Sequence, residues 1–200
     1  MNVRNAQEAE IDLLARIWYD AWRDAHEQIV PAELTRLRTL ESFRERLKAV
    51  LPDVRVIGEP GAPVGFCMLK GSELNQLFIA KTARGTGAAA ALLTDGEIRL
   101  SKQGVETAWL ACAIGNERAA RFYEKCGWRR VGNVVDELQT SEGAFFLEVW
   151  RYEKHLSQTG SPKASAERFI GATPRLAADA VSDGDSVPSE GSHDTRPSPR

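Results

Sequence analysis

The chain has few of the features that mark secreted, metal-binding or nucleic-acid-binding proteins. It has three cysteines, Cys67, Cys112 and Cys126, an odd number without metal-ligand spacing. Lysine and arginine number 26 against 28 acidic residues, for a net charge of −2, so no basic excess points to nucleic acid. Residues 1–10 lack the apolar run of a signal peptide, and no segment approaches the length of a membrane span. We therefore expect a cytoplasmic protein with reduced thiols, no metal, and neither nucleic acid nor membrane as a partner.

The composition is that of a soluble protein with one ordinary core. Hydrophobic residues make up 42% of the 200 positions and charged residues 27%. Beyond His155 the composition changes, because residues 158–200 are rich in Ser, Pro, Gly and Asp and offer little for burial. We expect one domain over residues 1–155 and a tail over residues 156–200 that is mostly disordered, with a short helix near residues 164–170.

The spacing of apolar residues predicts a mixture of helices and strands. Ile11, Leu14, Trp18 and Trp22 recur at helical spacing, whereas residues 73–79 alternate with the period of a strand. The expected helices cover residues 8–25, 34–47, 87–102 and 117–126, and the expected strands cover residues 1–6, 54–57, 63–69, 73–79, 105–113, 128–138 and 144–152.

Residues 77–93 place two glycines between an apolar strand and an alanine-rich helix. The first amides of a helix have no intrahelical partner, and with the helix dipole they attract an anion. Gly85 and Gly87 carry no Cβ, so a ligand can approach their backbone closely. This stretch therefore predicts a site for a phosphate or pyrophosphate group.

Three kinds of phosphate-binding loop compete for this stretch. A P-loop requires Gly-Lys-Ser/Thr at its end, but Gly87 is followed by Ala88. Residues 85–90 fit the loose dinucleotide pattern G-x-G-x-x-A, yet four residues separate them from their strand, and the next strand ends without a ribose-binding acid. The third kind is an acyl-CoA pyrophosphate loop with the pattern Q/R-x-x-G-x-G/A, which residues 84–89 match as Arg-Gly-Thr-Gly-Ala-Ala.

A second segment, residues 116–128, favours the third kind of loop. It closely resembles the N-x-x-A-x-x-F-Y-x-x-x-G-F/W segment of the GNAT N-acyltransferase superfamily. Residues 84–89 resemble the pyrophosphate loop of the same superfamily. The resemblance covers roughly residues 1–155. It implies an α/β (α+β) fold with a central, mixed, mostly antiparallel sheet of six to seven strands, flanked by about four helices. It also implies acetyl transfer from acetyl-CoA to a primary amine in a ternary complex, by a monomer or a homodimer.

The resemblance implies which residues bind the cofactor. Amides of the 84–89 loop would hold the pyrophosphate, main-chain groups near Leu77 and Ile79 would bind the pantetheine arm, and Asn116 would contact the cofactor besides capping its helix. Tyr123 would protonate the departing thiolate, although its pattern alone also fits a core aromatic. The expected cofactor-binding residues are Leu77, Phe78, Ile79, Arg84, Gly85, Thr86, Gly87, Ala88, Ala89, Asn116 and Tyr123.

Glu73 is the candidate general base. Strand alternation places Glu73, Asn75, Leu77 and Ile79 on one face, and a carboxylate on a central strand is costly to bury without a role or a partner. Glu73 precedes Arg84 by eleven residues, the offset of a catalytic glutamate in many members of the resembling family. An amine must lose a proton before it attacks a thioester, and a carboxylate can relay that proton. The alternative is a solvated glutamate at the edge of a strand.

The acceptor site is less defined by the sequence. The resemblance places His26 and Asn75 in the acceptor pocket, although a lone histidine is more often structural. Asp136, Glu137 and Glu142 lie in or near a connection that forms the other wall of the pocket in the family, where they would meet a cationic amine; a solvated turn explains them equally well. A non-catalytic acyl-CoA-binding module and a transferase for a longer acyl chain stay open as alternatives.

Overall fold

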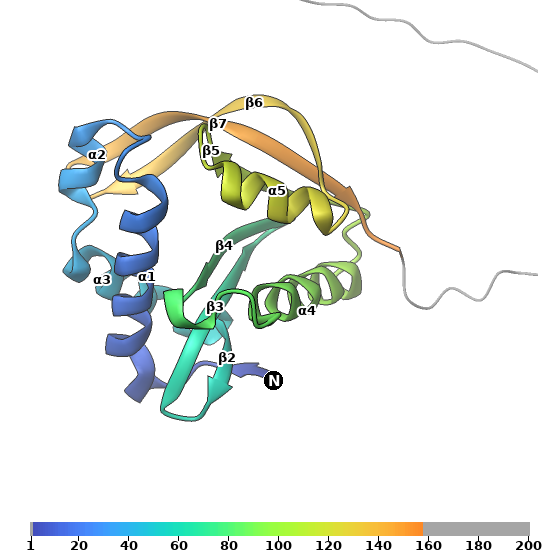
Figure 1. The fold of residues 1–200 in the computed structure, drawn as a ribbon, viewed down its shortest axis with the longest axis horizontal. Helices are drawn as coiled ribbons and strands as arrows, with labels where there is room; N and C mark the ends of the chain where they lie inside the picture. Colours follow the sequence, from blue (N-terminus) through green and yellow to red (C-terminus); the bar gives the residue numbers. More distant parts are fainter. Residues whose placement is uncertain (1, 158–200) are drawn as a thin grey trace, which may run out of the picture. The chain divides into compact units, whose positions relative to one another are not determined.

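The fold is built on one seven-stranded sheet in the part of the chain that the structure describes. The computed structural model describes residues 2–157, so the helix expected near residues 164–170 lies outside it. The strand order is β1-β2-β3-β4-β5-β7-β6 (Figure 1). β4 and β5 are parallel, and every other neighbouring pair is antiparallel. The expected mixed, mostly antiparallel sheet is therefore confirmed.

The described elements follow the predicted order along the chain. The strands are β1 Val3–Asn5, β2 Arg55–Glu59, β3 Ala62–Lys70, β4 Glu73–Ile79, β5 Thr107–Ala113, β6 Arg129–Thr140 and β7 Gly143–His155. The α-helices are α1 Ile11–His26, α2 Ala32–Leu37, α3 Leu40–Val50, α4 Ala88–Lys102 and α5 Glu117–Lys125. Short 3-10 turns occupy Glu8–Glu10, Leu51–Asp53 and Lys81–Ala83.

The second helical region is two helices rather than one. Arg38 leaves the helical conformation with φ −88° and ψ 70°, and α2 ends before it. Thr39 then acts as the N-cap of α3, because its hydroxyl accepts a hydrogen bond from the Ser42 amide at 3.1 Å. The periodicity of leucines across residues 34–47 concealed this break, since both helices bury their leucines on the same side.

Helices cover both faces of the sheet, and each face has its own core. On one face, Trp18 of α1 packs against Phe43 of α3 and Phe66 of β3, with ring centroids 4.8 and 5.3 Å apart. On the other face, α4 and α5 pack on alternate residues of β3 and β5, such as Cys67 and Leu110. The two helical layers therefore hold the central strands from opposite sides.

α4 lies unusually close to the sheet at Gly96. A Cβ on this residue would lie 3.2 Å from Leu74 Cδ1 and 3.5 Å from Cys67 Sγ. The glycine costs about 1 kcal/mol of helix propensity relative to alanine, and the close approach explains its use. The middle of α4 therefore packs closely against β3 and β4.

β4 and β5 separate soon after they meet. Their ladder contains a single pair, Glu73 with Trp109, close to the start of β4. β4 also carries a bulge against β3, because the register shifts between the pairs Met68–Gln76 and Leu69–Leu74. The bulge breaks the expected alternation: Leu74 packs in the same core as Leu77 and Ile79, so Glu73 does not share one face with the latter two.

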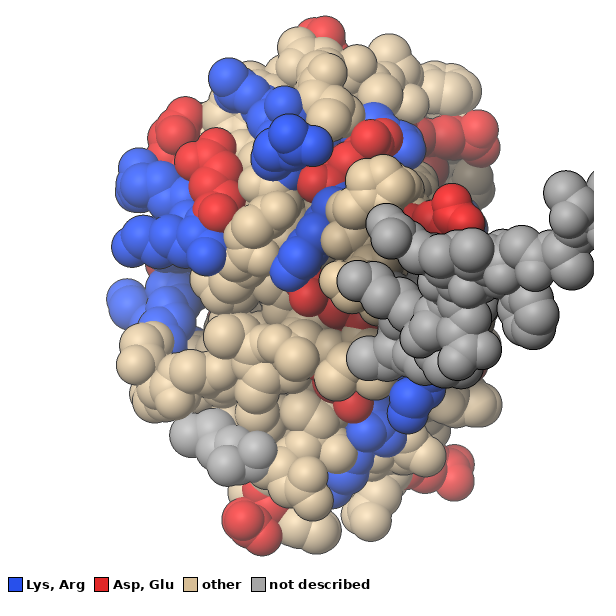
Figure 2. Space-filling model, turned by 90° about the vertical axis from the view of Figure 1, so that its right-hand side faces the viewer, with Lys and Arg blue, Asp and Glu red and all other residues tan. Residues whose placement is uncertain are grey.

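Charges of both signs lie side by side on one face of the molecule (Figure 2). Lysine and arginine side chains there have aspartates and glutamates as neighbours, with uncharged areas between them. Within residues 2–157, no helix is long and apolar enough to cross a membrane.

Candidate active site

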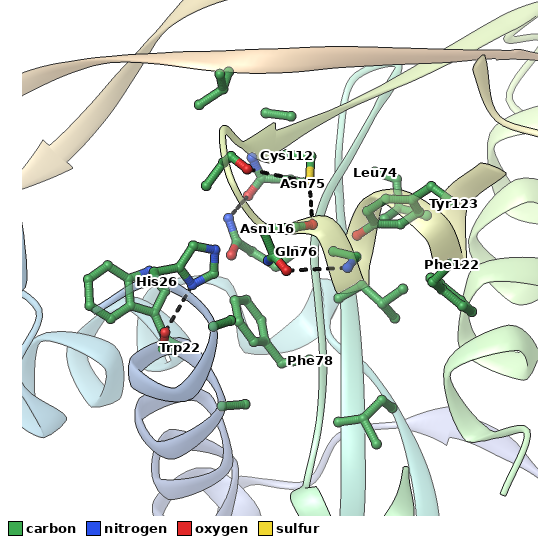
Figure 3. A pocket seen from close by; sticks show the side chains of 18 of the residues that line it. Trp22, His26, Leu74, Asn75, Gln76, Phe78, Cys112, Asn116, Phe122 and Tyr123 are labelled. Atoms are coloured by element: carbon green, nitrogen blue, oxygen red, sulfur yellow. Dashed lines mark hydrogen bonds between the residues drawn. The ribbon is translucent and has the colours of Figure 1, made fainter. Parts of the chain in front are cut away.

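A cavity of about 660 Å³ opens where β4 and β5 separate. Residues 73–79 of β4 and residues 111–113 of β5 line it, together with the start of α4 and residues of the other four helices. Figure 3 shows Trp22 and His26 of α1 on one side and Phe122 and Tyr123 of α5 on the other. The fold thus brings the two sequence motifs and the predicted acceptor residues to one cavity.

The glycine loop enters this cavity at the N-terminus of α4. Gly85 and Gly87 have φ values of 78° and 87°, a conformation that favours glycine. A Cβ on either would meet no atom within 4 Å, so the space beside the loop is open. The amides of Gly85, Thr86 and Gly87 donate to no other backbone or side-chain group in the described residues. These free donors, with the helix dipole, suit an anion.

Two side chains of the loop point away from the cavity. The Thr86 hydroxyl donates to the Ala83 carbonyl at 2.7 Å and closes the turn. The Ala88 methyl group is buried in the core of the α4 face. Neither side chain lines the cavity, so both residues offer a ligand only their main-chain groups.

Two arginines stand at the glycine-loop side of the cavity and share one aspartate. Arg84 and Arg118 both line the cavity, and both reach the Asp24 carboxylate of α1, at 2.9 and 2.8 Å. The hydrogen bond from Arg118 and the second one from Arg84 lower the pKa of Asp24. Two guanidinium groups with one carboxylate leave an excess of positive charge next to the free amides.

Tyr123 and Asn116 come from the second motif. The Asn116 side chain caps α5 by accepting from the Ala119 amide at 3.2 Å, as expected, and also lines the cavity. Tyr123 is 9% exposed, and its hydroxyl makes no hydrogen bond to the described residues. Burial raises the pKa of Tyr123 above its ordinary value, so the hydroxyl stays protonated at neutral pH and is available as a hydrogen-bond donor.

Glu73 is buried and faces a second acid. Its side chain is 6% exposed and accepts a hydrogen bond from Asn75 Nδ2 at 3.0 Å. Burial raises the pKa of Glu73 above 4.5; the negative charge of Asp136 adds to the rise, and the Asn75 hydrogen bond opposes it. Burial also raises the pKa of Asp136, which lines the same cavity. The solvated-edge alternative for Glu73 is therefore wrong.

His26 lines the cavity from the end of α1. Its Nδ1 lies 3.0 Å from the Trp22 carbonyl oxygen, and because a carbonyl only accepts, Nδ1 carries the proton. Burial lowers the pKa of His26, against the effect of this hydrogen bond. The ring, stacked on Trp22 with centroids 5.3 Å apart, is thus held neutral with Nε2 as a free acceptor.

Several cavity residues were not found from the sequence. Trp22, interpreted as core, lines the cavity, as do Gln76 and Arg46. Arg46 follows helical spacing after Phe43, and no sequence signal distinguishes it from a solvated arginine. Glu142, considered for the acceptor wall, instead pairs with Arg36 at 2.9 Å on the exposed hairpin turn and does not line the cavity.

The cysteines and acids offer neither a nucleophile nor a metal centre within residues 2–157. Burial raises the pKa of Cys67 and of Cys112 to about 12, so both thiols stay protonated at neutral pH. No group of three or more His, Cys, Asp or Glu side chains in this range is arranged to hold a metal ion.

The sequence resembles characterised and uncharacterised acetyltransferases. The pattern of the acetyltransferase (GNAT) family matches residues 11–128. An uncharacterized N-acetyltransferase of Mycobacterium tuberculosis is 32% identical over 105 residues, which cover 50% of this chain and 65% of that protein. The peptidyl-lysine N-acetyltransferase YjaB of Escherichia coli is 28% identical over 144 residues, covering 69% of this chain and 89% of YjaB.

Solved structures show the same fold. A GCN5-related N-acetyltransferase from Rhodopseudomonas palustris superimposes with a TM-score of 0.60 at 16% identity, covering 78% of this chain and 95% of the other. The protein yncA of Salmonella typhimurium, whose structure is described with its cofactor acetyl-CoA, superimposes with a TM-score of 0.54 at 15% identity, covering 82% of this chain and 98% of yncA.

Proposed function

Because this chain belongs to the acetyltransferase (GNAT) family, we propose that residues 1–155 form an N-acetyltransferase that moves an acetyl group from acetyl-CoA to a primary amine. The observation that carries the proposal is the convergence of the glycine loop, Tyr123 and Glu73 on one cavity. An anion site, a proton donor and a proton acceptor are the three parts that such a transfer requires.

The cavity fits acetyl-CoA as a substrate. The unpaired amides of residues 85–87, which stand beside open space, suit the pyrophosphate. The main chain of Leu77, Phe78 and Ile79 has no ladder partner on the β5 side and would bind the pantetheine arm as an added strand does. Arg84 and Arg118 supply positive charge for the remaining phosphate groups.

The reaction needs no group beyond the two substrates, water and the side chains of the cavity. The ammonium group passes one proton toward Glu73, and the free amine nitrogen attacks the thioester carbonyl. The bond between the carbonyl carbon and sulfur then breaks with its electron pair on sulfur, and the Tyr123 proton neutralises the leaving thiolate. The nitrogen loses its second proton, which returns through water to the Tyr123 oxygen, and Glu73 releases its proton to solvent. The products are the N-acetyl amide and coenzyme A.

The first test is titration calorimetry of the full-length chain with acetyl-CoA, NAD and ATP in parallel. We expect micromolar binding of acetyl-CoA alone, followed by release of free thiol when a primary amine is added. Binding without thiol release from any amine would favour an acyl-CoA-binding module. Faster turnover of a longer acyl-CoA than of acetyl-CoA would show that the enzyme transfers a longer acyl group. Binding of NAD instead would overturn the proposal.

Replacement of Tyr123 by Phe is expected to lower kcat about tenfold. The effect is moderate because a thiol with an ordinary pKa of about 8.5 can leave without complete protonation. Phe keeps the ring contacts of Tyr123 with Trp128 and Tyr152, so the affinity for acetyl-CoA should stay unchanged. Stopped-time thiol assays and calorimetry measure the two quantities. Loss of acetyl-CoA binding in this variant would show that Tyr123 has a structural role.

A further inference from the structure

The α1 and α3 side of the cavity contains a guanidinium group with no acidic partner. Arg46 of α3 lines the cavity. Its Cζ lies over the Trp18 ring, 4.5 Å from the ring centroid, and 5.9 Å from the centroid of Phe43. The aromatic faces hold the group in place. They do not satisfy its five N–H donors.

The other two cations of α3 each have an acid. Arg44 pairs with Asp12 at 2.5 Å and lies 3.8 Å from Glu41, and Lys48 pairs with Glu45 at 2.7 Å. Arg46 makes no hydrogen bond or ion pair within residues 2–157, although acids stand on its own helix. The cation that faces the cavity is thus the one left without a counter-charge.

The surroundings of Arg46 favour the binding of an anion to its guanidinium group. Burial, together with repulsion by Arg38, lowers the pKa of Arg46 to about 10, which still leaves it charged at neutral pH. Arg38 donates to the Gln139 carbonyl at 2.9 Å and has no carboxylate in hydrogen-bond contact among the described residues. Arg46 is partly buried, and an anion in the cavity would form charge-assisted hydrogen bonds with its guanidinium group.

The same cavity also holds negative charge for an amine. Glu73 and Asp136 line it, and Asp136 has no side-chain hydrogen-bond partner within residues 2–157. An ammonium group would be attracted to these carboxylates. Glu137 and Lys70 line the cavity as well, and the charge of Lys70 acts on both Glu73 and Asp136. The lining therefore carries carboxylates together with Arg46, which makes no ion pair with the described residues, and these charges of both signs suit a zwitterion.

We propose that the acceptor amine is a small amino acid or other aminocarboxylate, whose carboxylate binds Arg46 while its amine lies toward Glu73 and Asp136. This inference rests on the proposed acetyl transfer. A guanidinium binds a carboxylate in bidentate geometry, and a single negative charge balances it. An amine without an acid, such as a lysine inside a peptide, would leave Arg46 unpaired.

The test compares matched acceptors with the full-length wild-type chain. Glycine, alanine, leucine and phenylalanine are each assayed beside their carboxamides by release of free thiol from acetyl-CoA. The carboxamide has the lower ammonium pKa, so ease of deprotonation favours the amide. We expect the free acids to have kcat/KM values at least about tenfold higher. Equal rates, a preference for the amides, or a preference for a lysine-containing peptide would overturn the inference.

Arg46→Met tests the residue itself. Methionine retains apolar contact with Trp18, so we expect KM for the best acid to rise about 10- to 100-fold while KM for its amide and the affinity for acetyl-CoA stay unchanged. Arg46→Lys should restore part of the loss. Lys48→Met removes an exposed cation from the same helix and serves as the control without effect. An equal loss for acid and amide in Arg46→Met would overturn the assignment of Arg46.

Two results separate this inference from the proposed function. If acetyl-CoA does not bind, the proposed acetyl transfer fails as well. If acetyl-CoA binds and an amine without a carboxylate is the better acceptor, acetyl transfer stands and only the aminocarboxylate inference fails. Binding of acetyl-CoA without turnover of any acid in the series also overturns the inference.

Discussion

Gly87→Asp is expected to reduce the affinity for acetyl-CoA by about 100-fold or more. Gly87 has a φ of 87° and stands at the N-terminus of α4, where the open space beside it would receive the pyrophosphate. An aspartate puts a side chain and a negative charge into this space. At about 4 Å, two like charges repel by about 4 kcal/mol in an effective dielectric of 20, and screening at the exposed loop reduces this figure.

The matched control is Gly104→Asp at the other end of α4. Gly104 has a φ of 83° and equally open surroundings, so the variant carries the same backbone strain and the same added charge. Calorimetric titration with acetyl-CoA should show unchanged affinity in Gly104→Asp and no measurable binding in Gly87→Asp. Equal affinities in the two variants would remove the pyrophosphate assignment from this loop.

Glu73→Gln is expected to lower kcat about 100-fold, the usual contribution of a general base. Glutamine has nearly the same shape and can still accept the hydrogen bond from Asn75, so the fold should tolerate it. The base acts as the carboxylate, and burial raises the pKa of Glu73 above 4.5. In the wild type, kcat should therefore rise with pH as this carboxyl group loses its proton, at a pH above the ordinary value.

The pH profile distinguishes Glu73 from His26 as the base. Burial lowers the pKa of His26 below 6.5, so a rise in rate on the acid side has two candidate sources. Glu73→Gln should abolish this rise, while His26→Gln should retain it. Glu148→Gln, on the exposed side of β7, controls for the loss of a carboxylate. A profile unchanged in Glu73→Gln would transfer the role of base to another group.

Much of this site could be predicted because its parts depend on local sequence. Gly85 and Gly87 mark a helix N-terminus, and Asn116 marks another, since these residues act through backbone conformation and capping within a few positions. β4 was predicted with the bounds that the structure shows. In such segments the local preference and the final fold agree.

The rest depends on contacts that no local pattern contains. Arg46 enters the cavity because α3 packs beside Trp18, and Asp24 meets Arg84 and Arg118 from segments far apart in the chain. The bulge in β4 adds one residue against β3, and strand alternation cannot reveal it. The break at Thr39 had a capping residue as its signal, but the leucine periodicity continued across it.

The single residue pair between β4 and β5 divides the sheet into two groups of hydrogen-bonded strands. Strands β1 to β4 form one group, and β5, β7 and β6 form the other. The pair of Glu73 with Trp109 connects the two groups. The pantetheine arm of acetyl-CoA, bound along β4, would fill the space between the two groups of strands. Acetyl-CoA would then also stabilise the fold. At a concentration of 100 times its dissociation constant, it would raise the free energy of unfolding by about 2.7 kcal/mol. Glu73, the proposed base, is the β4 residue that pairs with β5, so the proton acceptor stands where the two groups of strands are joined.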